Sequence, residues 1–162
     1  MRKIRLLWLF LFVLSVAPPH GMAQQGAYRL SHLSIKEGLS ENSVRCLIQD
    51  KSGFIWMGTL DGLNKYNGYG FEIFRHNPKD SLSLCSNSIN ALMEDHNGNI
   101  WIGTQYGLSR FERDKGVFVN YFADDQEHKS LSANNVQAIF EDRNQQIWIL
   151  TTESLDRYVP GE

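Results

Sequence analysis

The chain has 162 residues, a formal net charge of −2, 42% hydrophobic residues and 21% charged residues. These proportions are ordinary for a globular domain, and the near-neutral charge gives no reason to expect binding to nucleic acid or to an anionic membrane surface. The chain has no glycine-rich nucleotide-binding box and no Gly-x-Ser-x-Gly, His-Glu-x-x-His or Cys-x-x-Cys motif, so we expect no cofactor and no catalytic residue.

The N-terminus has the layout of a secretory signal peptide. Three basic residues precede an apolar run over residues 6–17, which only Ser15 interrupts, and the small-x-small segment Gly21-Met22-Ala23 follows the run. A membrane anchor is the alternative, but the run is shorter than the roughly 20 residues that cross a bilayer. We therefore expect residues 1–23 to be a signal peptide of an exported protein.

One motif occurs three times in the rest of the chain. It has the forms GFIWMGTLDGLNKY, GNIWIGTQYGLSRF and QQIWILTTESLDRY, at residues 53–66, 98–111 and 145–158. The tryptophans of the three copies are 45 and 47 residues apart, and the fourth tryptophan of the chain lies in the apolar run. A repeat of this length indicates a solenoid, a propeller or another repeat array.

Each copy of the repeat predicts short strands joined by tight turns. The first strand of the first copy contains Val44, Cys46 and Ile48, and the apolar residues between them suggest a strand covered on both faces. An Asp-x-x-Gly turn follows, because Asp can bond the backbone two residues on and Gly accepts positive φ. Further strands are expected at 54–59, 63–66 and 71–75, at 100–104, 108–111 and 117–122, and at 147–151 and 155–158.

Four antiparallel strands in sequence form one blade of a β-propeller. The expected fold class is therefore all-β, an incomplete β-propeller with two full four-stranded antiparallel blades and part of a third. A pair of helices per repeat is the rival interpretation, and turn signals about every ten residues argue against it. The expected segments after the signal peptide are an N-terminal strand segment 24–41, blade 1 at 42–83, blade 2 at 84–131 and partial blade 3 at 132–162.

The recurring residues of the motif are expected to be structural. Gly58 and Gly103 lie inside strands, where the missing side chain lets a neighbouring backbone or ring approach closely. A tryptophan at one fixed position of each blade is expected to pack between blades, with stacking on a sugar ring as the functional alternative. The structural repeat motif comprises Asp50, Gly53, Trp56, Gly58, Thr59, Gly62, Leu63, Asp95, Gly98, Trp101, Gly103, Thr104, Gly107, Leu108, Asp142, Trp148, Thr151 and Leu155.

The two cysteines and the acidic clusters are expected to have structural roles. Cys46 aligns with alanines and Cys85 with serines in the other copies, so we expect two free cysteines. The segment 95–99 is similar to a calcium loop but lacks the glycine that the EF-hand pattern requires. The carboxylate pairs Glu94-Asp95 and Asp124-Asp125 could serve glycosidase chemistry, but they fall in a turn and in a polar loop.

The repeated pattern Asp-x-x-Gly-x-Ile-Trp-Ile-Gly-Thr-x-x-Gly-Leu-x-Arg-Tyr/Phe resembles the two-component regulator propeller repeat. Residues 33–40 resemble the L-S/T-x-x-x-G-L-S segment that precedes the first blade in hybrid two-component regulators, so the resemblance extends from residue 28 to about 158. The third copy departs from the pattern at Gln145, Leu150 and Ser154, where the other copies have glycine. Its regularity and its packing are therefore expected to be lower.

The resemblance implies a truncated periplasmic sensor domain that is not itself an enzyme. It implies a homodimeric parent, anchored in the inner membrane, that senses an oligosaccharide and has kinase, receiver and DNA-binding parts outside this chain. In the family, a strand near residues 28–35 completes the last blade of the ring. Because fewer than about four blades cannot close a ring, self-association through exposed blade edges is expected.

Two alternatives stay open. The chain could be a fragment of a propeller-fold carbohydrate-active enzyme, such as a polysaccharide lyase or a glycosidase. That function would require histidine, arginine or acidic residues that break the repeat and converge at one end of the blades. The chain could also be a small exported protein whose copies assemble a ring, which defined oligomers in solution would indicate.

Overall fold

The structure, a computed structural model, describes residues 29–124 and 130–159. The expected signal peptide at 1–23 lies outside these residues. Among the described residues, no helix is long and apolar enough to cross a membrane. The one helical element there is a short 3-10 helix, η1 (Ile35–Glu37), and the strands are β1 (Cys46–Gln49), β2 (Ile55–Gly58), β3 (Leu63–Tyr66), β4 (Phe71–Phe74), β5 (Ile89–Glu94), β6 (Ile100–Thr104), β7 (Gly107–Glu112), β8 (Val117–Tyr121), β9 (Val136–Glu141), β10 (Ile147–Thr151) and β11 (Leu155–Tyr158).

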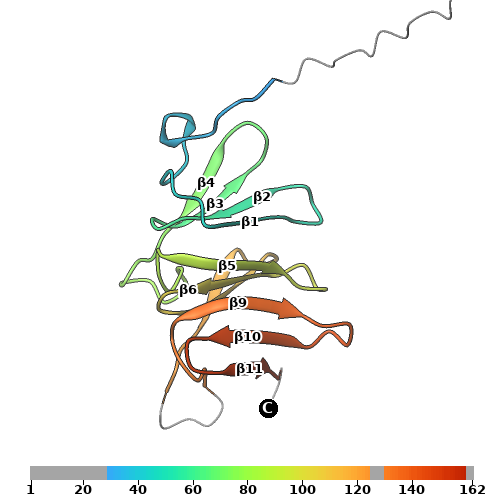
Figure 1. The fold of residues 1–162 in the computed structure, drawn as a ribbon. Coiled ribbons are helices and arrows are strands. Elements are labelled where there is room, and N and C mark those ends of the chain that lie inside the picture. Colours follow the sequence, from blue (N-terminus) through green and yellow to red (C-terminus); the bar gives the residue numbers. More distant parts are fainter. Residues whose placement is uncertain (1–28, 125–129, 160–162) are drawn as a thin grey trace, which may run out of the picture. The chain divides into compact units, whose positions relative to one another are not determined.

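The strands form three antiparallel meanders, which we call blades 1 to 3. Blade 1 has the order β1-β2-β3-β4, blade 2 the order β5-β6-β7-β8, and blade 3 contains β9, β10 and β11 (Figure 1). The register places each tryptophan in the second strand, and Trp56 faces Ile48 on one neighbouring strand and Lys65 on the other. The expected all-β fold class, with antiparallel four-stranded blades, is thereby confirmed.

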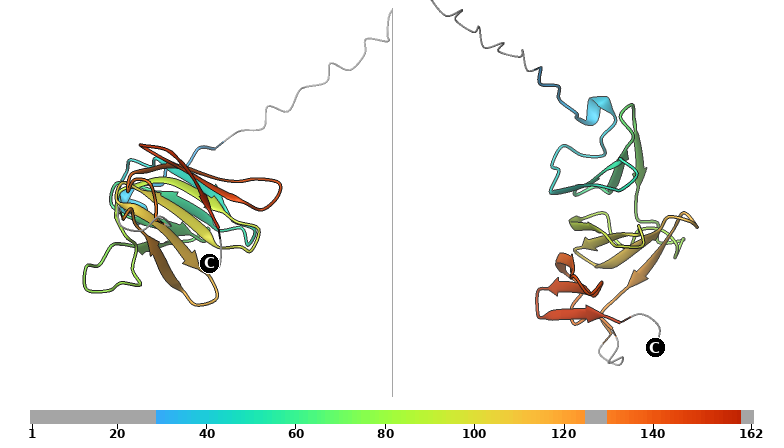
Figure 2. Two further views of the ribbon diagram at one scale, coloured as in Figure 1. Left: turned by 90° about the horizontal axis from the view of Figure 1, so that it is seen from below. Right: turned by 90° about the vertical axis from the view of Figure 1, so that its right-hand side faces the viewer.

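The three blades belong to one compact unit that begins at His32, and they contact one another in chain order. Strands β1 and β2 contact β5, and strands β5 and β6 contact β9 (Figures 1 and 2). A Cβ atom built on Gly58 would lie 2.5 Å from Cγ2 of Ile89, and one on Gly103 would lie 2.7 Å from Cγ1 of Val136. The close approach expected at these glycines therefore comes from an aliphatic side chain of the next blade.

The aromatic core lies between the blades. The Trp56 ring stacks on Phe74 of its own blade at 5.9 Å and also lies 5.5 Å from Phe111 of blade 2. Trp101 repeats this arrangement with Tyr121 at 5.9 Å and with Tyr158 of blade 3 at 4.9 Å. Both tryptophans are fully buried, so they have the inter-blade packing role that their fixed position predicts.

Two expectations about strands are corrected by the structure. Residues 29–34 contain no strand, and η1 follows them, because no described strand offers this segment a ladder to join. Ser34 begins η1 with a capping box that includes Glu37, and Gly38 ends it with φ of 108°. The first strands of the outer blades are also not covered on both faces, since Leu47 in β1 and Phe140 in β9 are each 64% exposed.

The segment before each blade inserts one leucine into the core. Leu39, Leu84 and Leu131 occupy equivalent positions and are all buried. The residue after each leucine, which is Ser40, Cys85 or Ser132, contacts a threonine 19 positions further along the chain. Residues 38–40 (G-L-S) therefore belong to a connecting segment that precedes blade 1, and equivalent segments precede blades 2 and 3.

Candidate functional site

The aspartate of each first turn binds the tryptophan of its own blade. One carboxylate oxygen of Asp50 accepts hydrogen bonds from the backbone N–H groups of Ser52 and Phe54, at 2.9 and 3.0 Å. The other accepts the indole N–H of Trp56 at 2.7 Å. The Asp95–Trp101 and Asp142–Trp148 pairs repeat this bond at 2.9 and 3.1 Å. Sequence reasoning missed this bond, although the constant spacing of six residues was its signal.

These hydrogen bonds lower the pKa of the three turn carboxyls and so favour their ionised form. Burial alone would raise the pKa of Asp50, but the hydrogen bonds from Trp56 and Phe54 and the charge of Arg113 hold it below its usual value. Burial opposes a lowered pKa at Asp95 as well, and there Asn99 and Trp101 are the donors that outweigh it. The segment 95–99 is expected to be a turn rather than a calcium loop. In the structure, the Asp95 carboxylate of this segment accepts hydrogen bonds from N–H donors.

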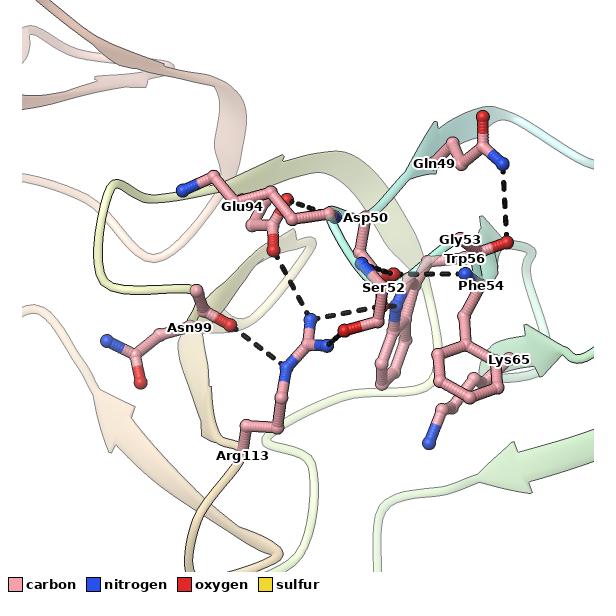
Figure 3. Close-up of polar contacts among 12 residues, drawn as sticks. Gln49, Asp50, Ser52, Gly53, Phe54, Trp56, Lys65, Glu94, Asn99 and Arg113 are labelled. Carbon is pink, nitrogen blue, oxygen red and sulfur yellow. Dashed lines mark hydrogen bonds and ion pairs between the residues drawn. The ribbon is translucent and has the colours of Figure 1, made fainter.

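Arg113 joins the turns of blades 1 and 2 (Figure 3). It comes from the turn after β7, and its guanidinium group lies 3.0 Å from an Asp50 oxygen and 2.8 Å from the Ser52 hydroxyl. The same nitrogen that reaches Asp50 lies 3.4 Å from Glu94, so one cation serves carboxylates of two blades. Glu94 and Asp95 thus have separate structural partners and do not form a free carboxylate pair.

A second contact at this end repeats between successive blades. The backbone N–H of Lys51, the residue after Asp50, donates to the Glu94 carboxylate of blade 2 at 2.8 Å. The backbone N–H of His96, the residue after Asp95, donates to the Glu141 carboxylate of blade 3 at 3.2 Å, and its Nδ1 contacts the same oxygen. We call this contact the carboxylate latch, and the sequence analysis did not anticipate it.

The opposite end of the blades carries the β2–β3, β6–β7 and β10–β11 connections. The Thr59 hydroxyl donates to the Gly62 carbonyl at 3.0 Å, and Thr104 and Thr151 make the same bond to residues 107 and 154. The N–H of Gly62 then donates to the carbonyl of Asn87 in the next blade at 2.8 Å. The glycine is required because its φ is 115° and a Cβ atom would lie 2.6 Å from the Phe74 carbonyl oxygen.

The same threonine hydrogen bond holds the base of each connection, but the residues at the tips of the three connections differ. The tip residues are Leu60-Asp61, Gln105-Tyr106 and Thr152-Glu153. Tyr106 is 63% exposed, and its ring lies 6.3 Å from that of Phe122, which is also exposed. Arg75 and Asp61 form an exposed ion pair of 2.9 Å at the tip in blade 1. We call this end the variable end, and its rigid bases with unlike tips make it the candidate ligand-binding surface.

The two cysteines lie in different environments and are free thiols. Cys85 is buried and accepts a hydrogen bond from Ser109 at 3.0 Å, and burial raises the pKa of its thiol. Burial also raises the pKa of Cys46 to about 11. Among residues 29–124 and 130–159, no group of three or more His, Cys, Asp or Glu side chains is arranged to hold a metal ion. Asp125 of the second carboxylate pair lies outside the described residues.

The family model described as "two component regulator propeller" matches residues 38–61, 83–106 and 130–153. The protein "Histidine kinase P4" of Formosa agariphila is 45% identical over 62 residues, which are 38% of this chain and 4% of that protein. The extracellular domain of the hybrid two component system BT3049 from B. thetaiotaomicron has 32% sequence identity and a TM-score of 0.70. That match covers 75% of this chain and 17% of the solved chain, so this chain spans a small part of each relative.

A second kind of neighbour shares the fold alone. Virginiamycin B lyase from Staphylococcus aureus is 15% identical, with a TM-score of 0.51 over 76% of this chain and 43% of that chain. The matches to the family model coincide with the connection, the first strand and the tryptophan strand of each blade. The expected family resemblance is therefore confirmed, and the three blades of this chain are two-component regulator propeller repeats.

Proposed function

We propose that this chain forms part of the ligand-sensing propeller domain of a hybrid two-component regulator and that its ligand is an oligosaccharide. The observation that carries the proposal is the match of all three blades to the regulator repeat, together with 32% identity to the BT3049 extracellular domain. Both the whole regulator's kinase activity and its assembly as a homodimer belong to this proposal. Export to the periplasm belongs to it as well.

The variable end is the surface where we place the ligand. Repeated threonine and backbone hydrogen bonds hold the base of each connection, and this rigidity reduces the entropy lost when a ligand binds. The exposed ring of Tyr106 can pack against the C–H face of a sugar, and the exposed charges of Asp61 and Arg75 can bind hydroxyl groups. The buried tryptophans are less suited to this role because both of their faces pack within the core.

We propose binding rather than catalysis as the role of this chain. The acidic residues at the turn end, which include Asp50, Glu94 and Asp95, hold backbone, indole or guanidinium donors. At the variable end, the carboxylate of Asp61 pairs with the guanidinium group of Arg75. The likeness to virginiamycin B lyase supports a shared fold and gives no argument for a shared reaction.

Substitution of Tyr106 by alanine tests this assignment. We expect calorimetric titration of the chain with a panel of oligosaccharides to identify a ligand. Tyr106→Ala should weaken its binding about five- to thirtyfold, since loss of one aromatic contact costs about 1–2 kcal/mol. Tyr69→Ala is the matched control, because Tyr69 is 98% exposed in the β3–β4 turn at the other end of the blades. Equal losses for both variants, or a loss for Tyr69→Ala alone, would refute the placement at the variable end.

A further inference from the structure

The open face of blade 3 carries several exposed apolar side chains. Phe140 is 64% exposed, Leu155 is 59% exposed and Leu150 is 42% exposed, and Ala138 lies beside them. These four residues line one shallow hollow, which no described strand covers. We call this surface the blade 3 face, and the two interfaces inside the chain show what kind of surface fits it.

The first rule, the volume rule, concerns the space that one blade leaves for a side chain of the next blade. Gly58 of blade 1 receives Ile89 from the first strand of blade 2, and Gly103 receives Val136 at the equivalent position of β9. Leu150 occupies the same position in blade 3, opposite Ala138 in the register. Since Leu150 fills the space that glycine leaves open in the other blades, a residue as large as Val or Ile cannot pack there in the same way.

The second rule concerns the carboxylate that accepts a backbone N–H from the preceding blade. Lys51 and His96 each follow a turn aspartate, and each donates its backbone N–H to a glutamate at the end of the next blade's first strand. Arg143 is the equivalent residue of blade 3. It is exposed, and among the described residues it has no hydrogen-bond or ion-pair partner. The carboxylate latch is therefore half formed at the blade 3 face, where the backbone N–H of Arg143 is in the donor position and no carboxylate among the described residues accepts it.

We propose that the blade 3 face binds another propeller blade whose first strand has Gly or Ala opposite Leu150 and a carboxylate beside Arg143. The chain's own blade 1 does not meet either condition, because it carries Val44 and Gln49 at these two positions. The face thus selects a blade of different sequence over a second copy of this chain. This inference rests on the two internal interfaces and is independent of the proposed ligand.

A tandem extension of the chain tests the volume rule and the carboxylate latch directly. Because Val159 is equivalent to Glu112, a second copy of residues 113–159 added after Val159 would supply the fourth strand of blade 3 and a further blade. In that copy, the residues equivalent to Val136 and Glu141 would face Leu150 and Arg143. We expect changing the copied Val136 to Ala to raise the thermal midpoint by about 5 °C, and a further change of the copied Glu141 to Gln to lower it again. A higher midpoint with valine than with alanine would overturn the proposal.

Self-association of the natural chain provides a second test that does not depend on the added blade. In contrast to the self-association that exposed blade edges alone would predict, we expect sedimentation velocity to show no head-to-tail association of the natural chain through the blade 3 face. The double variant Leu150→Gly with Gln49→Glu should associate at least tenfold more strongly. Leu150→Gly with Gln49→Lys is the control and should remain like the natural chain. The proposal would be wrong if the natural chain associated in a way that Phe140→Glu abolished, or if the double variant behaved like the natural chain.

Discussion

At the scale of single residues, the turn aspartates connect stability to pH. The pKa of Asp95 is held below its usual value by hydrogen bonds from Asn99 and Trp101, which outweigh the opposing effect of burial. A carboxyl whose pKa is lowered on folding stabilises the protein above its unfolded pKa of about 3.9, and the contribution is lost as pH falls through the lower folded pKa. The pKa values of Asp50 and Asp142 are shifted in the same direction. Stability should therefore fall as the pH drops below about 4.

The variant Asp95→Asn isolates this contribution. Asparagine places an NH₂ group where a carboxylate oxygen now accepts the Trp101 N–H, so we expect a loss of about 1–3 kcal/mol at pH 7. The loss should shrink as the pH falls through the lowered folded pKa of Asp95, because the wild-type carboxyl becomes protonated there. Urea unfolding between pH 2 and 7 measures this difference, and the exposed Asp114→Asn serves as the control. A difference that did not vary with pH would contradict the explanation.

Gln145 carries backbone strain that the other copies avoid. It has φ of 64°, whereas Gly53 and Gly98 have φ of 89° and 85° in the same turn. A residue with a side chain disfavours this region by about 1 kcal/mol, so Gln145→Gly should raise the free energy of unfolding by up to about that amount. Denaturant titration measures the gain. The reverse change at the equivalent position, Gly98→Gln, should destabilise the chain, and a neutral effect at both sites would exclude strain as the reason.

At the scale of elements, the glycines in β2 and β6 set the distance between blades. A Cβ atom on Gly103 would lie 2.7 Å from Val136, so we expect Gly103→Ala to destabilise the contact of blades 2 and 3 by about 1–3 kcal/mol. Val136→Ala should recover part of this loss in the double variant, because it removes the atoms that clash. The measurement is a double-mutant cycle from urea unfolding.

Gly70→Ala is the control for this cycle. A Cβ atom on Gly70 would have no neighbour within 4 Å, and the glycine does not adopt positive φ, so its substitution should be nearly neutral. A neutral effect of Gly103→Ala would show that this glycine is not needed for close packing of the blades. The same conclusion would follow if the losses in free energy of unfolding from Gly103→Ala and Val136→Ala simply added in the double variant.

At the scale of the whole molecule, the N-terminal segment predicts that the protein is exported. The solved neighbour with 32% sequence identity is an extracellular domain, and the N-terminal segment has the layout of a signal peptide. We expect the exported protein to begin at Gln24, and N-terminal sequencing or intact mass of secreted material checks this. Retention of residues 1–23 on the exported chain would refute cleavage near Ala23, and replacement of Ala23 by a bulky residue should block processing.

The sequence by itself determined the number of blades, their strands and the places where the chain turns. These features depend on local preferences, and the regular spacing of Trp56, Trp101 and Trp148 made them visible without any coordinates. Strands predicted at 63–66 and 155–158 have the same bounds as β3 and β11. The position of glycine inside a strand also predicted close packing before the packed group was known.

Only the tertiary structure decided which groups meet across the blades. The Glu94 and Glu141 latches join residues more than 40 positions apart, and no local pattern states that the backbone of Lys51 or His96 is the donor. The segment around η1 formed no strand, because a strand requires a hydrogen-bonded neighbour that propensity alone does not supply. Local sequence therefore determined the blade as a unit, and the long-range packing of one blade on the next determined the interfaces and the surface that remains open.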